Sequence, residues 1–522
     1  MKIERTRNAK RNVLFGLIYK VINILLPFIV RTAMMYTLGM EYLGLSSLFT
    51  SILTVLNLTE LGVGSAIVYH MYKAIAEDDE ETICALLNFY KKIYRVIGII
   101  VLAVGLILIP FLPHLIKGGY PSDINLSVLY ILYLVDTVSS YLLFAYYNSL
   151  LNAFQRNDIT SNIASVVSIV RYVSQALILL AFRNYELFIL VLPVMTIVSN
   201  IITAIAAKRM YPQYTCRGQI SKDLRTDITV KVKGMIISKV QAVTRNSFDS
   251  IFISAFLGLG LNAIYGNYYY IMESVIGVLF IFTSSITSGV GNSVAMESVE
   301  KNYADMNKIN FVYMWISGWC TICMLCLYQP FMLIWAGREK MFPVPVMLLF
   351  CIYFYSLKIG DIRFVYFDVN GPWWENRYKA IAEAVSNIVL NYILGKYFGV
   401  YGILTATIIT ILVINFGYGS QIVFQHYFGL DKLPEYFRKN LVYLCMTLIS
   451  GGVTYVCCSF LPEGNIIAFA GKMCICVILP NIIYFALYFR NKDFKIAIPW
   501  IIRIMGLNRI GIIRRIENWI DQ

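Results

Sequence analysis

Two apolar segments carry charged side chains at spacings that place them on one face of a membrane helix. The first segment, residues 13–36, holds Lys20, Asn23, Pro27 and Arg31. At about 3.6 residues per turn these four positions share one stripe. A cation near the centre of a bilayer costs about 2.5 to 3.5 kcal/mol on insertion scales, so the stripe should face protein or water instead of lipid. The sequence therefore predicts a helix that lines a wet cavity.

The second segment, residues 234–257, holds Lys239, Arg245, Asn246 and Asp249 within an arc of about 120° on a helical wheel. One interpretation is structural: Arg245 and Asp249 form an intrahelical ion pair, while the cations of the first segment extend toward opposite membrane surfaces. The other interpretation is a cationic cavity between the two helices that binds an anion.

We predict an anion-binding site made of five basic residues: Lys20, Arg31, Lys239, Arg245 and Arg171. Four carboxylates inside apolar segments are candidates for coupling transport to a proton or sodium ion: Asp249, Glu60, Asp136 and Glu273. The alternative for each carboxylate is a structural role, either hydrogen-bonded in the core or paired with a buried cation. Asp136 and Arg171, for instance, would pair across the bundle.

The elements that position these residues are membrane helices. The chain has 522 residues, of which 58% are hydrophobic and 14% charged, and its mean hydropathy of +0.67 excludes a soluble protein. We expect an all-α polytopic membrane protein with about 14 transmembrane helices. The predicted spans are residues 13–36, 44–69, 89–112, 124–150, 161–182, 186–207, 234–257, 261–292, 308–335, 343–368, 378–398, 400–425, 439–461 and 465–489.

The net charge of +14 reflects membrane sidedness rather than nucleic-acid binding. Most Lys and Arg residues fall at the termini and in alternate connections, of which 208–233 is the most basic. Both termini are therefore predicted to be cytoplasmic. The acidic run 77–81 resembles a sugar-nucleotide metal motif in spacing, but we interpret it as a solvated loop.

Eleven cysteines lie almost entirely in apolar segments, and Cys320, Cys323 and Cys326 have a spacing that superficially suggests a metal site. No histidine is near them. Because thiols in membrane helices serve mainly as small apolar fillers, we expect no metal, no disulfide and no cofactor.

An offset of about 219 residues relates Lys20 to Lys239, Leu38-Gly39 to Leu257-Gly258, and Asn157 to Asn376. These identities and the order of apolar segments predict two pseudo-symmetric six-helix lobes plus two C-terminal helices. The predicted divisions are an N-terminal lobe at 1–207, a basic cytoplasmic connection at 208–233, a C-terminal lobe at 234–425, two additional helices at 426–490, and an amphipathic cytoplasmic tail at 491–522.

Three stretches carry a family resemblance: GPWWENRYKA at 371–380, YFGVYG at 397–402, and LGMEYLGL at 38–45. They resemble bacterial polysaccharide flippases of the multidrug/oligosaccharidyl-lipid/polysaccharide superfamily. The resemblance implies translocation of an undecaprenyl-pyrophosphate-linked oligosaccharide, without catalysis, by rocking of two lobes that exposes a cavity to one side at a time. It also implies membrane lipids and a polysaccharide polymerase as partners.

The lipid II flippases of this superfamily have cavity arginines on helices one, two and eight. Lys20 and Arg31 match helix one, but helices two and eight carry Glu60 and Glu273 here. This departure disfavours a peptidoglycan precursor and favours a repeat unit of capsule, O-antigen or exopolysaccharide.

Two other functions remain open. A cation-coupled multidrug exporter shares the fold but would favour acidic cavity residues. A membrane polymerase or glycosyltransferase would need catalytic carboxylates on a substantial outer loop, and the outer connections are short.

Overall fold

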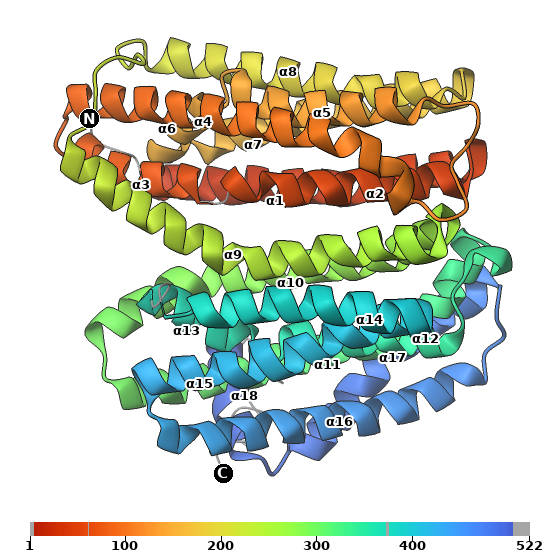
Figure 1. Cartoon of the computed structure of the whole chain (residues 1–522). Coiled ribbons are helices and arrows are strands. Elements are labelled where there is room, and N and C mark those ends of the chain that lie inside the picture. The colour runs from red at the N-terminus through yellow and green to blue at the C-terminus, as the bar shows by residue number, and fades with distance from the viewer. Residues whose placement is uncertain (1–4, 61, 372–374, 505–522) are drawn as a thin grey trace. The chain divides into compact units, whose positions relative to one another are not determined.

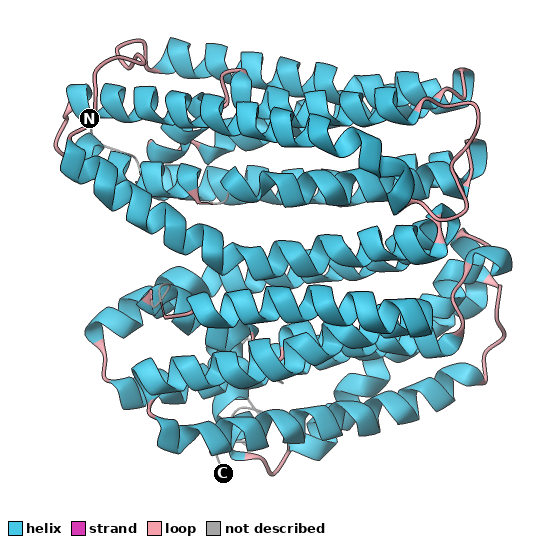
Figure 2. Cartoon of the chain, in the orientation of Figure 1, coloured by secondary structure: helices cyan, strands magenta, loops and turns pink. Residues whose placement is uncertain are grey.

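The computed structural model describes residues 5–60, 62–371 and 375–504. Helices of α, 3₁₀ and π type make up all the secondary structure in this described part of the chain, and it contains no strand (Figure 2). The predicted all-α class is confirmed. Residues 372–374, within the resemblance stretch, and residues 505–522, in the predicted tail, lie outside the described residues.

The contacts divide the chain into two compact units, Met1–Gly266 and Asn267–Gln522. In the first unit, α1 packs mainly against α7, α5 against α8, and α2 against α9 (Figure 1). Its elements are α1 (Arg5–Thr37), α2 (Met40–Leu56), η1 (Asn57–Glu60), α3 (Val63–Ala76), α4 (Glu80–Leu108), η2 (Ile109–Leu115), α5 (Leu126–Leu142), α6 (Tyr146–Ala153), α7 (Asn157–Ala181), α8 (Tyr185–Met210), α9 (Lys222–Leu257) and the start of α10 (Leu259–Met296).

In the second unit, α11 packs against α12, α16, α17 and α18. The elements after α10 are α11 (Val299–Trp335), η3 (Arg338–Lys340), α12 (Val344–Lys358), α13 (Asp361–Asn370), α14 (Arg377–Thr410), η4 (Ile411–Tyr418), α15 (Gly419–Val423), η5 (Phe424–Phe428), η6 (Leu430–Lys432), α16 (Leu433–Ser459), α17 (Ile466–Tyr488) and α18 (Lys492–Ile504). Both η4 and η5 are π-helical. The first helix of the predicted tail, α18, is anchored by Phe494, whose ring stacks on Trp315.

By length and composition, 10 described helices could cross a membrane, or 11 when the bent pair α5–α6 is one span. This count treats Arg377–Phe428 as one span although Gly399 interrupts its helical geometry, and it omits the interrupted pair α2–α3 and the polar helix α9. When Arg377–Phe428 is divided at Gly399 and the pair α2–α3 and α9 are included, the described helices are consistent with the predicted fourteen spans. The chain is a multi-pass membrane protein.

The division after Gly266 places residues 234–266 with the first unit. The predicted lobe boundaries rest on an internal repeat rather than on contacts, and they stay a prediction. Local geometry matches that repeat at one pair of turns. Gly39, before α2, has φ 110° and ψ 179°, and Gly258, before α10, has φ 95° and ψ 173°.

Candidate functional site

Two helices of the first unit are broken inside predicted spans. The α2–α3 span is interrupted between Asn57 and Gly62, and Gly62 has φ +104°, a conformation that favours glycine. A Cβ at this position would lie 2.6 Å from the Cβ of Met235. The α5–α6 span bends by 48°, and Phe144 at the bend has φ 60°. Non-helical backbone at membrane depth is tolerated where it is buried in protein or lines a water-filled cavity.

A cavity of about 940 Å³ lies beside both breaks, within the first unit. Hydroxyl and amide side chains dominate its wall, and Lys239 is the only charged side chain among the lining residues that the structure describes. The polar lining residues are Ser65, Tyr69, Tyr72, Tyr90, Tyr94, Ser140, Asn148, Ser149, Asn152, Asn157, Asn200 and Lys239. Asparagine and hydroxyl groups both donate and accept hydrogen bonds, so this wall can bind a polyhydroxylated ligand.

The wall is held in place by its own hydrogen bonds. The hydroxyl of Tyr90 donates to that of Tyr94, whose ring packs edge-on against Tyr141. Tyr141 in turn donates to Asn57 Oδ1 at 2.7 Å, in the α2–α3 break. The amide of Asn200 donates to the carbonyl of Ser139 at 3.3 Å. The aromatic side of the cavity is therefore tied to the broken span.

Of the five predicted anion-binding residues, only Lys239 is a lining residue of this cavity. Lys20 lies half-buried on α1 and makes no ion pair with any described residue. Arg31 donates to the carbonyl of Ala263 at 3.4 Å, near the start of α10. Arg171 lies over the ring of Tyr172, 5.0 Å from its centroid, and Arg245 is half-buried on α9.

The three described coupling candidates each accept a hydrogen bond from a hydroxyl group. Asp249 is fully buried and accepts from Tyr265 at 3.0 Å. Glu273 accepts from Tyr269 at 2.8 Å. Asp136 accepts from Thr196 Oγ1 at 2.5 Å, and it makes no salt bridge with Arg171 among the described residues. The side chain of Glu60 lies outside the described part of the structure.

The second unit contains a charge network that the predicted site does not include. Lys358 ends α12 and pairs with Asp361, which begins α13, at 2.6 Å across the break between the two helices. Tyr313 of α11 donates to the same carboxylate at 2.5 Å. The break therefore has local charge compensation.

Three further members of this network are almost completely buried: Arg363, Lys379 and Glu383. Arg363 donates to the backbone carbonyl of Asn415 at 3.1 Å, in the π-helical stretch η4. The amide of Asn415 donates to Glu383 Oε2 at 3.1 Å, and Lys379 lies 3.4 Å from the same oxygen. The spacing of Lys379 and Glu383, four residues apart, is the one sequence signal for this pair.

Three cysteine Sγ atoms lie within 4.8 Å of one another: those of Cys326, Cys458 and Cys476. They come from α11, α16 and α17, and their side chains are free thiols. Cys320, part of the spacing noted in the sequence, does not belong to this cluster. Spacing within one helix could not identify partners contributed by two other helices.

Comparisons with solved structures show the fold. No family profile matches the sequence, and no curated protein matches it. The lipid II flippase MurJ in an inward closed conformation aligns with a TM-score of 0.62 at 14% identity, covering 91% of this chain and 99% of that chain. An inward-facing multidrug resistance MATE family transporter of the MOP superfamily aligns with a TM-score of 0.58 at 15% identity, covering 78% and 96%.

The Vibrio cholerae MATE transporter VcmN in its bent form aligns with a TM-score of 0.53 at 15% identity, covering 84% of this chain and 99% of that chain. The chain has the fold of these transporters. At these identities the likeness establishes architecture, and the substrate has to be inferred from the residues of this chain.

Proposed function

We propose that the protein is a flippase that translocates an undecaprenyl-pyrophosphate-linked oligosaccharide across the bacterial plasma membrane. The observation that carries this proposal is the 940 Å³ cavity, whose described wall combines asparagine, serine and tyrosine side chains with one lysine and no carboxylate. Amides and hydroxyls match the hydrogen-bonding groups of sugars, and a lysine complements a phosphate. The polyprenyl tail remains in lipid.

The fold shared with MurJ, named as a lipid II flippase, supports a lipid-linked substrate. The fold shared with multidrug transporters supports a second candidate, a cation-coupled drug exporter. A cationic drug would find no carboxylate among the described lining residues, which favours the flippase. The proposed cargo is the lipid-linked repeat unit of a capsule, O-antigen or exopolysaccharide. The proposed partner protein is a polysaccharide polymerase.

The test that bears most directly on the site replaces the cavity lysine. Lys239→Ala should leave the protein inserted but slow translocation about 10- to 100-fold, since it removes one charged hydrogen bond to the cargo. Lys239→Arg should retain more activity than Lys239→Gln because the charge is kept. The measurement is the accumulation of lipid-linked oligosaccharide in the inner leaflet, with Lys233→Ala, on the same helix outside the cavity lining, as control. Full activity of Lys239→Ala would remove the lysine from the site.

The wider cationic site is tested by a combined variant. Replacement of Lys20, Arg31, Lys239 and Arg245 by glutamine should abolish translocation if the four residues serve the anionic headgroup. Loss of the protein itself would instead indicate that the cations balance buried carboxylates such as Asp249. A properly expressed quadruple variant with full activity would end the proposal of a cationic site.

Energy coupling is a separate part of the proposal. We infer that at least one of Asp249, Glu60, Asp136 and Glu273 links transport to a proton or sodium gradient, because ionisable groups in membrane spans are retained for such uses. Transport in vesicles should fall when the relevant gradient is collapsed. Transport that continues after both gradients are collapsed would rule the coupling out.

A further inference from the structure

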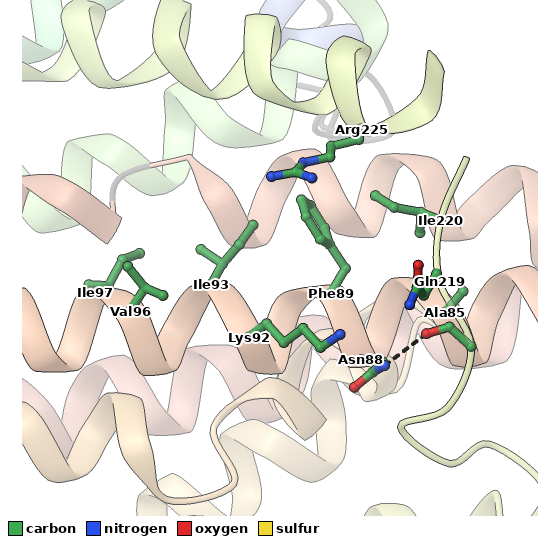
Figure 3. Close-up of a pocket in the computed structure, with 11 residues that line it drawn as sticks. Ala85, Asn88, Phe89, Lys92, Ile93, Val96, Ile97, Gln219, Ile220 and Arg225 are labelled. Carbon is green, nitrogen blue, oxygen red and sulfur yellow. Dashed lines mark hydrogen bonds between the residues drawn. The ribbon is translucent and has the colours of Figure 1, made fainter. Parts of the chain in front are cut away.

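A second hollow in the first unit lies between α4 and the chain that leads into α9 (Figure 3). It has a volume of about 400 Å³ and shares no lining residue with the larger cavity. Its floor is apolar, formed by Phe89, Ile93, Val96 and Ile97 of α4. Val96 is 56% exposed, and the exposed residues Ile99 and Ile100 continue the apolar surface along the same helix. The floor is therefore continuous with a surface of α4 that suits lipid.

Two cations border this apolar floor, Lys92 from α4 and Arg225 from α9 (Figure 3). Neither has an ion-pair partner among the described residues, and no carboxylate belongs to the described lining. Two cations near the hollow do have such partners: Arg217 pairs with Glu80 at 2.7 Å, and Lys231 pairs with Asp227 at 3.0 Å. The hollow thus carries two uncompensated positive charges beside exposed apolar side chains.

The wall opposite α4 is fixed in place. The amide of Asn88 donates to the carbonyl of Gly218 at 2.8 Å, shown as the dashed line in Figure 3. The backbone N–H of Thr215 also approaches Cys84 Sγ at 3.4 Å. These contacts hold residues 215–220 against α4, so Gln219, whose side chain has no described partner, is presented at the edge of the hollow as a third hydrogen-bonding group.

We propose that this hollow binds the headgroup phosphate of an anionic glycerophospholipid. Lys92, Arg225 and Gln219 contact the phosphate oxygens, and an acyl chain lies along Phe89, Ile93 and Val96. Basic pockets beside membrane helices on the cytoplasmic side bind acidic headgroups in this manner, and the loop charges predict that this end of the unit is cytoplasmic. A zwitterionic headgroup fits less well, because its ammonium group would meet two cations and no described carboxylate.

The experiment titrates lipids onto the purified, delipidated full-length protein in detergent and counts bound lipids by native mass spectrometry. Phosphatidylglycerol should bind at least about tenfold more tightly than phosphatidylcholine with the same acyl chains, because each of the two cations favours an anionic headgroup. The double variant Lys92→Gln/Arg225→Gln should lose this preference. The charge-preserving variant Lys92→Arg/Arg225→Lys should keep it.

The matched control is Lys73→Gln/Lys301→Gln, which removes two exposed cations that lie outside the hollow and pair with acids four residues away. It should leave the preference unchanged; an equal loss in the control would overturn the site in favour of general surface charge. Gln219→Glu places an anion in the hollow and should also weaken phosphatidylglycerol binding. If the double variant fails to fold, this single variant tests the site, and unchanged binding by it would overturn the proposal.

A third arm separates this lipid from the proposed cargo. Undecaprenyl phosphate carries the same phosphate chemistry, and tighter binding of it than of phosphatidylglycerol at the wild-type hollow would overturn the assignment to a glycerophospholipid. Equal binding of phosphatidylglycerol and phosphatidylcholine would overturn the site altogether. None of these outcomes depends on translocation, so the result is independent of the proposed flippase activity.

Discussion

Asp79 illustrates how a single residue sets a helix boundary on the surface of this protein. Its side chain accepts a hydrogen bond from the backbone N–H of Thr82 at 2.9 Å and so caps α4. Because the hydrogen bonds from Thr82 stabilise the carboxylate, the pKa of Asp79 is lowered from the ordinary value of 3.8. The cap lies at the start of the helix that carries Lys92.

This cap predicts that the stability of the first turn of α4 depends on pH only in the acidic range. A carboxylate with a lowered pKa contributes its stabilisation fully above the ordinary value and loses it as pH falls further, through the folded-state pKa. Hydrogen exchange in the first turn of α4 should therefore accelerate below about pH 4, beyond the intrinsic pH effect. Asp79→Asn should remove this dependence, and Asp79→Ala should destabilise the turn by about 0.5 to 2 kcal/mol at neutral pH. An unchanged acid response in Asp79→Asn would contradict the assignment.

Gly62 gives a sharper prediction at the same scale. Gly62→Ala should destabilise the first unit by roughly 2 kcal/mol, because alanine is strained at positive φ and its Cβ would collide with Met235. Thermal unfolding in detergent measures the effect. Gly260→Ala is the control, since a Cβ there meets nothing within 4 Å in a helical conformation. If both variants unfolded alike, the special conformation at Gly62 would be unimportant.

At the scale of elements, the stretch from α12 to η4 concentrates buried charge where helices are irregular. Glu383→Gln should destabilise the protein by about 3 to 5 kcal/mol, because Lys379 loses its carboxylate partner, 3.4 Å away, in a site that is almost completely buried. Protein abundance and thermal stability measure this loss. The double variant Lys379→Met/Glu383→Met removes both charges and should recover part of it. A double variant as damaged as the single one would show that the pair is not the source of the effect.

The sequence predicted Lys239 as a site residue, but it did not predict the asparagine and tyrosine side chains that line the same cavity. A lysine in an apolar segment stands out because of its insertion cost. Asn148 and Asn200 are uncharged and do not stand out in this way. They come from α6 and α8, and the packing of these helices brings both to the wall of one cavity. Similarly, Arg363 reaches Asn415 through a backbone carbonyl in a π-helical stretch, which side-chain periodicity does not reveal. Hydropathy predicted fourteen spans, a number with which the described helices are consistent, but it did not predict where the helices break.

At the scale of the whole molecule, the distribution of Lys and Arg predicts both termini in the cytoplasm. Single cysteines replacing Lys117 or Arg183 should react with an impermeant reagent in intact cells, whereas cysteines replacing Lys222 or Lys432 should not. The exposed Cys445 and Cys474 are first changed to serine to lower the background. Labelling of the second pair would reverse the predicted topology, and with it the leaflet assigned to the lipid hollow.

The polarity of α9 has a consequence for how the chain is made. Lys239, Arg245 and Asp249 lie in the second half of α9. Among the described helices of the first unit with 18 residues or more, α9 alone is too polar to be a candidate membrane span by itself. It packs against α2, η1 and α3, which leave the ribosome earlier. We therefore expect the translocon to release α9 into lipid only when those earlier helices are present to receive it. A chain truncated to begin after α3 should leave α9 outside the bilayer, so the order of synthesis is itself a requirement for membrane integration.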